Sequence, residues 1–339
     1  MSVASRVDDV LRAAAALLDP QRDAGRAARE AAVIECALSA PMADRVFDVA
    51  SARYSRASVE ALANDALAGR RVALVLAATV ATAPLRAIAL PWLAGADRIA
   101  VRPSRRQRRL VEACARAFER DAIVCVDAAP DGVDHVIAYG ADDTLVAIES
   151  AIARGVSFEG RGHGFGVVYV REASDEAARA VALDVALHDQ RGCLSPQAVF
   201  VRGDAVAFAG ALHKALAAVE RVLPRGRVAV GEAAAAMQWQ GVMAARASWF
   251  RRGATHAVAA FDAPALDATP GLRNVVVSAV TGVDDVRAAL GANARYVTCV
   301  GTDESAPVWG FTAARVVALG AMQDPPLDGP EDPRRPTRR

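Results

Sequence analysis

The sequence predicts an α/β protein with two doubly wound domains and parallel-rich sheets, and three observations support this prediction. Continuous apolar runs rich in β-branched residues, typical of strands buried on both faces, begin at 71–78 and recur to the end of the chain. Segments with the apolar spacing of amphipathic helices separate these runs. The chain has 339 residues, 53% of them hydrophobic, which is enough for one large core or two medium-sized ones.

The first domain is expected over residues 1–166. Its first 70 residues have apolar positions at helical spacing throughout. The strands expected after them are 71–78, 98–102, 122–127 and 134–140, and the intervening helices are 84–94, 105–118 and 142–153. Alternation of this kind predicts a parallel sheet covered by helices on both sides, as in nucleotide-binding domains.

The glycine-rich run GRGHGFG at 160–166 leads into a strand and not into a helix. A phosphate-binding loop needs the opposite order, so a connector between domains is the better interpretation. The fingerprint GxGxxG is also absent after the strand 71–78, where the chain reads AATVATAP.

The second domain is expected over residues 167–324, and a surface tail rich in proline and charge over 325–339. An amphipathic helix capped by Ser174 is expected over 174–189. The remaining helices are expected at 204–220 and 231–247, and the strands at 167–170, 198–201, 274–280, 296–300 and 314–318.

Charge and hydropathy limit the partners and the compartment. Forty basic residues against 39 acidic ones give a net charge of +1, so no overall field attracts nucleic acid. The longest apolar stretch, 72–85, is shorter than the roughly 20 residues that span a bilayer. The N-terminus carries Asp8 and Asp9 and no cleavage pattern. We therefore expect a cytoplasmic protein with no membrane or nucleic-acid partner.

The five cysteines are scattered and odd in number, and none stands in a CxxC pair or a Cys/His cluster. Neither a disulfide framework nor a metal site is expected. Cys193 differs from the others because it follows an amphipathic helix in a turn, between Gly192 and the Ser195-Pro196 pair. From the residues alone it is either a nucleophile or an inert loop cysteine, and the other four are expected in the core.

Four segments, in order, resemble the LuxC-type acyl-CoA reductases, a branch of the aldehyde dehydrogenase superfamily. They are VALVLAATVATAPLRAIALPWLAGADRIAVRPSRR (72–106), AYGADDTLVAI (138–148), HDQRGCLSPQAVFV (188–201) and RVVALGAMQDPPLDGP (315–330). The last two, the nucleophile loop and the closing segment, are the specific ones. The resemblance implies an aldehyde dehydrogenase-like fold and, as is usual in the superfamily, a homo-oligomer. The chain is shorter than typical members, mostly on the N-terminal side.

The resemblance also implies a mechanism. The Cys193 thiolate attacks an acyl thioester on coenzyme A or an acyl carrier protein, and a nicotinamide cofactor reduces the resulting acyl-enzyme to an aldehyde. The backbone N–H of Cys193 and a side chain of the first cofactor loop would hold the oxyanion. Superfamily members usually have asparagine in that loop, whereas this chain has Thr79, which implies a weaker donor. Proton-transfer candidates are His188, His163 and Glu159, each of which also fits a structural role.

For the cofactor, Arg102 stands where the superfamily commonly has lysine, and Lys214 is the one lysine in the chain. Because arginine binds phosphate bidentately, NADPH is expected before NADH, with Pro103 and Ser104 beside the same group. The other cofactor-binding residues implied by the resemblance are Thr79, Val80, Gly140 and Thr144. The basic run 105–109 is either a solvated helix face or a surface that attracts the phosphates of coenzyme A or an acidic carrier protein.

Two other functions stay open at this point. A non-catalytic relative, acting as a binding or assembly partner, fits Thr79, the short N-terminal side and the absence of a Glu-x-Phe-Gly-Pro-type segment, where residues 271–280 read GLRNVVVSAV. An acyl transferase or thioesterase would use Cys193 without a nicotinamide.

Overall fold

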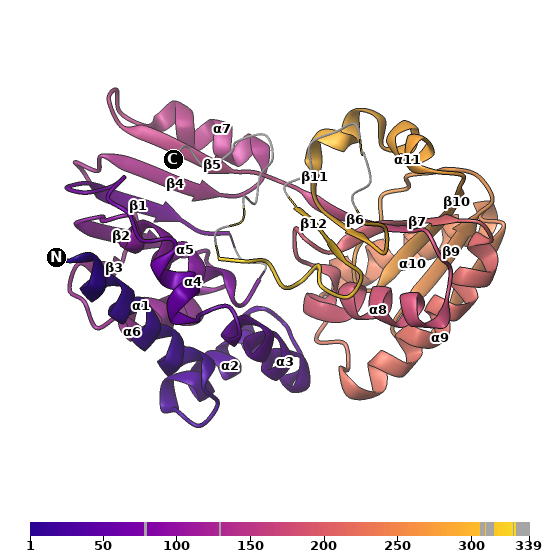
Figure 1. The fold of residues 1–339 in the computed structure, drawn as a ribbon, viewed down its shortest axis with the longest axis horizontal. Coiled ribbons are helices and arrows are strands. Elements are labelled where there is room, and N and C mark those ends of the chain that lie inside the picture. Colours follow the sequence, from indigo (N-terminus) through magenta and orange to yellow (C-terminus); the bar gives the residue numbers. More distant parts are fainter. Residues whose placement is uncertain (78–79, 129, 306–308, 310–314, 328, 330–339) are drawn as a thin grey trace. The chain divides into compact units, whose positions relative to one another are not determined.

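The computed structural model describes residues 1–77, 80–128, 130–305, 309, 315–327 and 329 (Figure 1). Within these residues the chain divides into two compact units. Unit 1 contains Met1–His163 together with Pro326 and Leu327, and unit 2 contains Gly164–Pro325. The division falls inside the run GRGHGFG, which links two strands. The roles expected for the two domains stay predictions, and most of the expected tail lies outside the described residues.

Unit 1 begins with a group of helices and continues as an α/β domain. Its helices are α1 (Val3–Leu18), α2 (Asp23–Glu35), α3 (Ala40–Ser51), α4 (Arg56–Glu60), α5 (Ala83–Leu93), α6 (Arg108–Ala117) and α7 (Asp142–Ala151). Its strands are β1 (Arg71–Val75), β2 (Arg98–Arg102), β3 (Ile123–Cys125), β4 (His135–Tyr139) and β5 (Ser157–Arg161). The expected helical start and the expected strand–helix alternation are both present.

The described strands of unit 1 form a parallel sheet in the order β3-β2-β1-β4-β5. The chain passes from β1 outward to β2 and β3, then returns to the other side of β1 with β4. This reversal makes the carboxyl ends of β1 and β4 a topological switch point, the place where open α/β sheets bind ligands. The buried centres of β1 and β2 are apolar, as their sequences predict.

Unit 2 is a second α/β domain. Its helices are α8 (Asp175–Ala186), η1 (Leu187–Gln190), α9 (Ala205–Val222), α10 (Val230–Arg246), α11 (Val283–Leu290) and η2 (Gly291–Tyr296). Its strands are β6 (Phe165–Val170), β7 (Pro196–Arg202), β8 (Trp249–Arg252), β9 (Ala257–Phe261), β10 (Asn274–Val280), β11 (Val297–Thr302) and β12 (Arg315–Ala318). Within the described residues these strands form one sheet in the order β12-β11-β6-β7-β10-β9-β8. All neighbours are parallel except β8, which is antiparallel to β9.

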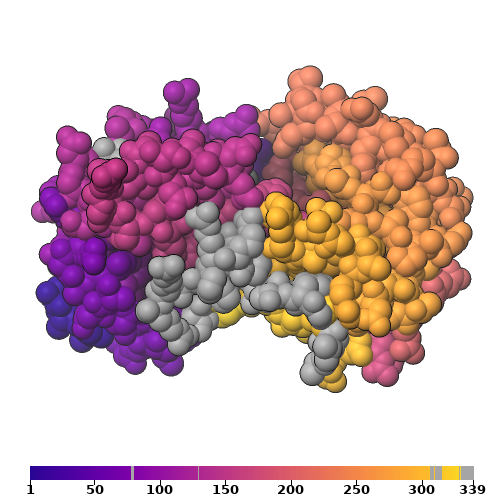
Figure 2. Space-filling model, turned by 90° about the horizontal axis from the view of Figure 1, so that it is seen from above, coloured from indigo at the N-terminus to yellow at the C-terminus, as the bar shows by residue number. Residues whose placement is uncertain are grey.

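Alternate side chains of the unit 2 sheet form separate cores on its two faces. Val199, Val201 and Val277 pack with α8 and α9 on one face. Ala198 and Phe200 pack with α11 on the other face, where Trp239 and Met243 of α10 also pack against the sheet. Figure 2 shows the molecule in space-filling form, coloured along the sequence from indigo at the N-terminus to yellow at the C-terminus. The period of two along each strand thus makes this sheet doubly wound.

Three strands were not expected from the sequence, and the helix expected over 174–189 is shorter. β5 and β8 are edge strands that contain charged residues, so they lack an apolar run. β9 reads AVAAF, and its alanines favour a helix over a strand. α8 ends at Ala186, because the backbone turns to positive φ at His188.

Candidate active site

Cys193 lies in a tight turn between η1 and β7. The turn is closed by a hydrogen bond from the Ser195 N–H to the Gly192 carbonyl oxygen (3.0 Å). All five cysteines lie in the described part of the chain, and Cys193 alone is exposed. Burial raises the pKa of the Cys114 and Cys299 thiols to about 12, which keeps them protonated and unreactive.

Strands on either side hold the backbone of this turn. Thr298 of β11 donates its hydroxyl to the Cys193 carbonyl oxygen (2.6 Å). The Gly166 N–H of β6 donates to the Ser195 carbonyl oxygen (3.0 Å). A Cβ on Gly166 would lie 2.4 Å from the Leu194 carbonyl oxygen, so only glycine permits this approach. The Cys193 backbone is therefore fixed while its side chain stays exposed.

The closing segment packs against the same turn. The Gln323 carboxamide donates to the Ser195 hydroxyl (3.1 Å) and to the Asp184 carbonyl oxygen (3.3 Å). The buried Asp184 carboxylate of α8 accepts the N–H groups of Gly320 (2.7 Å) and Met322 (2.9 Å). The tertiary structure thus brings together the two segments that most specifically resemble the acyl-CoA reductases.

The residues just before the turn are strained. His188, Asp189 and Gln190 have φ angles of 56°, 52° and 61°, in the left-handed region that favours glycine. A side chain with a Cβ costs about 1–2 kcal/mol per residue there, so other contacts must stabilise this segment. All three residues are buried, and the His188 carbonyl accepts the Arg191 N–H (3.1 Å). The backbone that leads to Cys193 is therefore held in one unusual conformation.

The other proton-transfer candidates belong to unit 1. Glu159 of β5 forms ion pairs with Arg161 and with His135 (3.8 Å). Burial acts to raise the pKa of Glu159, but His135 and Arg161 outweigh it, and the net shift is downward. His163 donates its backbone N–H to an Asp142 carboxylate oxygen (3.2 Å). In these contacts Glu159 acts as an ion-pair partner and His163 as a turn residue.

The predicted cofactor residues lie after β1, β2 and β4, at the carboxyl edge of the unit 1 sheet. Arg102 ends β2, and its Nε donates to the Asp127 carbonyl oxygen (3.2 Å). Pro103 follows, and the Ser104 hydroxyl accepts the Arg106 N–H (3.3 Å). The Val80 carbonyl accepts a hydrogen bond from the Gln107 carboxamide (3.1 Å). Thr79 lies outside the described residues.

Gly140 and Thr144 flank the start of α7, after β4. The Gly140 N–H donates to the Arg161 carbonyl oxygen (3.1 Å), and Thr144 lies in the first helical turn. That turn also contains Asp142 and Asp143, whose charges disfavour a phosphate at this N-terminus. The first turn of α5, after β1, contains no acidic residue. Of the two helix starts, α5 therefore suits a pyrophosphate better.

In the described part of the chain, most arginines of the basic run 105–109, which leads into α6, form no ion pair. Arg102, Arg105 and Arg106 are exposed and form no ion pair with any residue that the structure describes. Arg108, by contrast, pairs with Glu112 (2.8 Å) and Asp127. Exposed guanidinium groups beside a topological switch point fit a phosphate-bearing dinucleotide.

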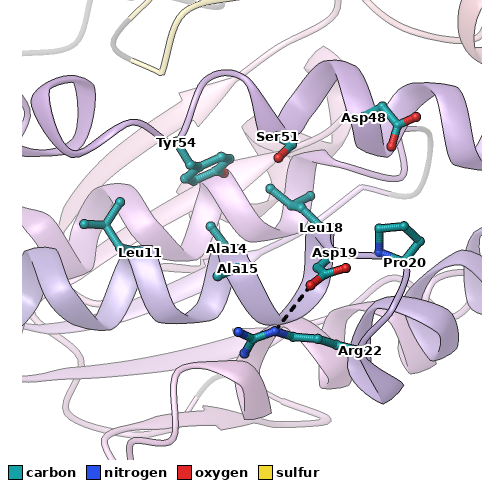
Figure 3. A pocket seen from close by; sticks show the side chains of 10 residues that line it. All are labelled: Leu11, Ala14, Ala15, Leu18, Asp19, Pro20, Arg22, Asp48, Ser51 and Tyr54. Atoms are coloured by element: carbon teal, nitrogen blue, oxygen red, sulfur yellow. Dashed lines mark ion pairs between the residues drawn. The ribbon is translucent and has the colours of Figure 1, made fainter.

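Unit 1 also contains a pocket of about 520 Å³, whose lining side chains are drawn in Figure 3. It is lined by α1, the turn that follows it, the end of α3, and Tyr54. Asp19 in its rim pairs with Arg22 (3.6 Å). None of the predicted catalytic or cofactor-binding residues lines this pocket.

The described residues contain no group of three or more His, Cys, Asp or Glu side chains placed to hold a metal ion. Among the described helices, none combines the length and the apolar character needed to cross a bilayer.

Sequence reasoning missed several buried polar residues around Cys193. They are Asp184, Gln190, Arg273 and Thr298, all 2% exposed or less. Asp184 and Arg273 each interrupt or border an apolar run, in VALDVAL and in LRNVVV, and a charge in such a run is the signal that was available. Their partners are far along the chain, so no local pattern identifies them.

Comparisons with known proteins agree with this architecture. The sequence profile of the acyl-CoA reductase (LuxC) family matches residues 117–327. No curated protein matches the chain by sequence.

The fold is similar to solved aldehyde dehydrogenase structures. An NAD-dependent benzaldehyde dehydrogenase from Corynebacterium glutamicum superposes with a TM-score of 0.75 and 13% identity, over 94% of this chain and 82% of that one. An acetylating aldehyde dehydrogenase from Geobacillus thermoglucosidasius superposes with a TM-score of 0.65 and 14% identity, over 95% and 83%. The chain therefore belongs to the LuxC acyl-CoA reductase family, and its fold is that of the aldehyde dehydrogenases, with two doubly wound α/β domains.

Proposed function

We propose that this protein reduces an acyl thioester to an aldehyde, with Cys193 as the nucleophile and NADPH as the cofactor. The observation that carries the proposal is the exposed Cys193 side chain on a turn whose backbone is held by Thr298, Gly166 and Gln323. Membership of the LuxC acyl-CoA reductase family supports the substrate class.

The chemistry proposed for Cys193 has two parts. Its thiolate attacks the thioester carbonyl carbon and forms a new carbon–sulfur bond, and the bond to the carrier sulfur breaks with its electron pair on that sulfur. The leaving carrier thiolate takes up the proton that Cys193 lost on ionisation. After reduction of the acyl group, the carbon–sulfur bond to Cys193 breaks and the aldehyde leaves. The Cys193 N–H is proposed to donate to the developing oxyanion. Sulfur suits both parts, because it is a good nucleophile and a good leaving group.

The nucleotide is proposed to bind unit 1 at the carboxyl ends of β1 and β2. A bound nicotinamide would supply the hydride. Arg102, with Ser104 beside it, is proposed to hold a ribose phosphate, and Val80 lies in the loop before α5. The exposed Arg105 and Arg106 are proposed to attract the phosphates of coenzyme A or an acidic carrier protein.

One assay tests the proposal. Purified protein receives NADPH with either acyl-CoA or acyl carrier protein, the nicotinamide absorbance is followed, and aldehyde is quantified. NADPH consumption that matches aldehyde formation and is abolished by Cys193→Ala would support the proposal. Acylation of Cys193 without hydride transfer would indicate a transferase or thioesterase. If Cys193 is not acylated and NADPH does not bind, a non-catalytic binding role replaces the enzyme.

A charge reversal tests the cofactor choice. Arg102→Glu should raise the KM for NADPH about 10–100-fold, because a charge-assisted contact worth about 1.5–3 kcal/mol is lost. The KM for NADH should change far less. Arg98→Glu is the matched control, since Arg98 is exposed at the opposite end of the same strand. Equal losses for the two cofactors would contradict phosphate recognition by Arg102.

A further inference from the structure

We propose that the Asp189–Arg273 ion pair and the Gln190 carboxamide form a positioning unit for the nucleophile turn, residues 191–195. The proposal rests on the proposed role of Cys193 as the nucleophile. None of the three residues is proposed to touch the substrate. They act through the backbone that presents Cys193.

The Asp189–Arg273 ion pair is fully buried, and Asp189 lies four residues before Cys193 in the chain. Asp189 is 0% exposed and Arg273 is 1% exposed. One Asp189 carboxylate oxygen accepts hydrogen bonds from Nε (3.0 Å) and Nη2 (2.7 Å) of Arg273. The remaining Nη1 of Arg273 donates to Glu220 of α9 (2.6 Å). The guanidinium thus joins the start of β10 to α9 and to the segment before the turn.

The second oxygen of Asp189 is also bonded. It accepts the Gly226 N–H (2.9 Å) and Nη1 of Arg191 (3.3 Å). Arg191 in turn pairs with Glu232 at the start of α10 (3.1 Å). The Asp189 backbone carbonyl accepts the Leu272 N–H (3.2 Å). Asp189 is therefore bonded through both its side chain and its main chain to residues from separate elements.

Such a pair is poorly explained as a source of stability. A buried ion pair stabilises a fold little more than apolar residues of the same volume, because desolvation offsets the attraction. Both partners of the ion pair lie in strained backbone. Asp189 belongs to the segment 188–190 with positive φ, and Arg273 (φ 65°) follows Leu272 (φ 57°). Two strained segments joined by one ion pair fit a role in holding one particular backbone conformation.

Gln190 closes the turn itself. Its Nε2 donates to the Pro196 carbonyl oxygen (2.8 Å) and to the Asn274 carbonyl oxygen (3.0 Å). The first bond joins the two ends of the turn that contains Cys193, and the second fixes them to β10. Gln190 is 2% exposed, so water does not replace these bonds. A nucleophile displaced by about 1 Å can lose about 100-fold in rate, which gives this clamp a catalytic consequence.

The test compares Gln190→Met and Arg273→Lys with the control Leu290→Ala. Leu290 is a buried residue of α11 outside this cluster, so its truncation destabilises unit 2 without touching the turn. Gln190→Met introduces no charge and has similar volume, which keeps it foldable if Arg273→Lys is not. Three rates are measured: acylation of Cys193 by acyl-CoA, alkylation of each cysteine by iodoacetamide, and amide hydrogen exchange of peptides covering 188–197.

We expect acylation to fall about 100-fold in Gln190→Met while alkylation of Cys193 changes only a few-fold, because the small reagent needs no alignment. Exchange in 188–197 should rise about tenfold, and Cys114 and Cys299 should stay unreactive, which shows that the fold is intact. Leu290→Ala should change neither acylation nor exchange in the turn.

Two results separate the possible failures. If acylation and exchange in Gln190→Met match those of the wild type, or if Leu290→Ala has the same effects, the positioning unit is overturned. If the wild type is not acylated but exchange in the turn still rises only in Gln190→Met and Arg273→Lys, the proposed function of Cys193 fails while the conformational role of the cluster holds.

Discussion

Individual polar residues in unit 2 are buried, and their surroundings shift their pKa values in opposite directions. Burial raises the pKa of the Asp184 carboxyl to about 7, although two backbone N–H groups and Arg315 favour its charged form. His256 is buried beside His213, with 3.0 Å between Nε2 of His256 and Nδ1 of His213. Burial, and then the neighbouring His213, lower the pKa of His256 to about 4. Each shift predicts its own pH dependence of stability.

Asp184 should make the folded state less stable as pH rises. Its folded pKa of about 7 lies above the ordinary value of 3.8, so the folded state binds more protons between these values. The stabilisation is complete below pH 3.8 and is lost as pH rises through 7, with an upper limit of about 4 kcal/mol. Urea unfolding at pH 5 and 8 should therefore show Asp184→Asn gaining stability relative to the wild type as pH rises. A constant difference would contradict the shift.

His256 should make the folded state less stable as pH falls. Its folded pKa of about 4 lies below the ordinary 6.5, so the unfolded state binds more protons between these values. Stability contributed by the neutral form is present above pH 6.5 and is lost as pH falls through 4, by about 3 kcal/mol at most. His256→Gln should flatten the decrease in Tm between pH 7.5 and 5. An unchanged decrease in Tm in His256→Gln would contradict the shift.

At the scale of elements, close approaches between strands and turns decide where Cys193 lies. β6 approaches the turn at Gly166, and β11 approaches it through Thr298. The sequence located β6 and β11 within a few residues, because buried parallel strands have continuous apolar runs. It predicted neither which strands are neighbours nor the end of α8 at Ala186. Strand pairing depends on long-range contacts, and the end of α8 depends on the buried cluster around Asp189.

Gly166→Ala should strongly reduce the proposed acyl reductase activity. The added Cβ would lie 2.4 Å from the Leu194 carbonyl oxygen and 2.6 Å from the Met322 side chain, so the turn must shift. A displacement of about 1 Å predicts a loss of about 100-fold in kcat. The matched control is Gly210→Ala in α9, where nothing lies within 4 Å of the new Cβ. That variant should keep its kcat and gain about 0.5–1 kcal/mol of stability from helix propensity. Equal activity of both variants would contradict the close approach.

At the scale of the whole molecule, the chain contains two units with separate cores. β1, β2 and β4 carry the central core of unit 1, and β6, β7 and β10 that of unit 2. The alternation of strand and helix runs already favoured two such domains. The sequence could not show that Pro326 and Leu327 return to unit 1, where the Leu327 carbonyl accepts a hydrogen bond from the buried Arg86 (3.0 Å).

Separate cores predict separate responses to a core truncation. Ile99 of β2 is 0% exposed, and Ile99→Ala should cost about 2–5 kcal/mol through lost burial and a residual cavity. Amide exchange should accelerate in β1, β2 and β4, while β7 and β10 keep their wild-type protection. Equal acceleration in both sheets would show that the two units unfold as one.

By itself, the sequence determined the α/β class, the two successive units, and Cys193 as the candidate nucleophile, because each depends on a local pattern or a short motif. Only the tertiary structure decided what holds Cys193. Asp189 and Arg273 are 84 residues apart, and Gln323 and Ser195 are 128 apart. No periodicity or propensity links such residues. Their contacts form only when both elements pack in one unit, where burial makes each charge and each polar group require a partner.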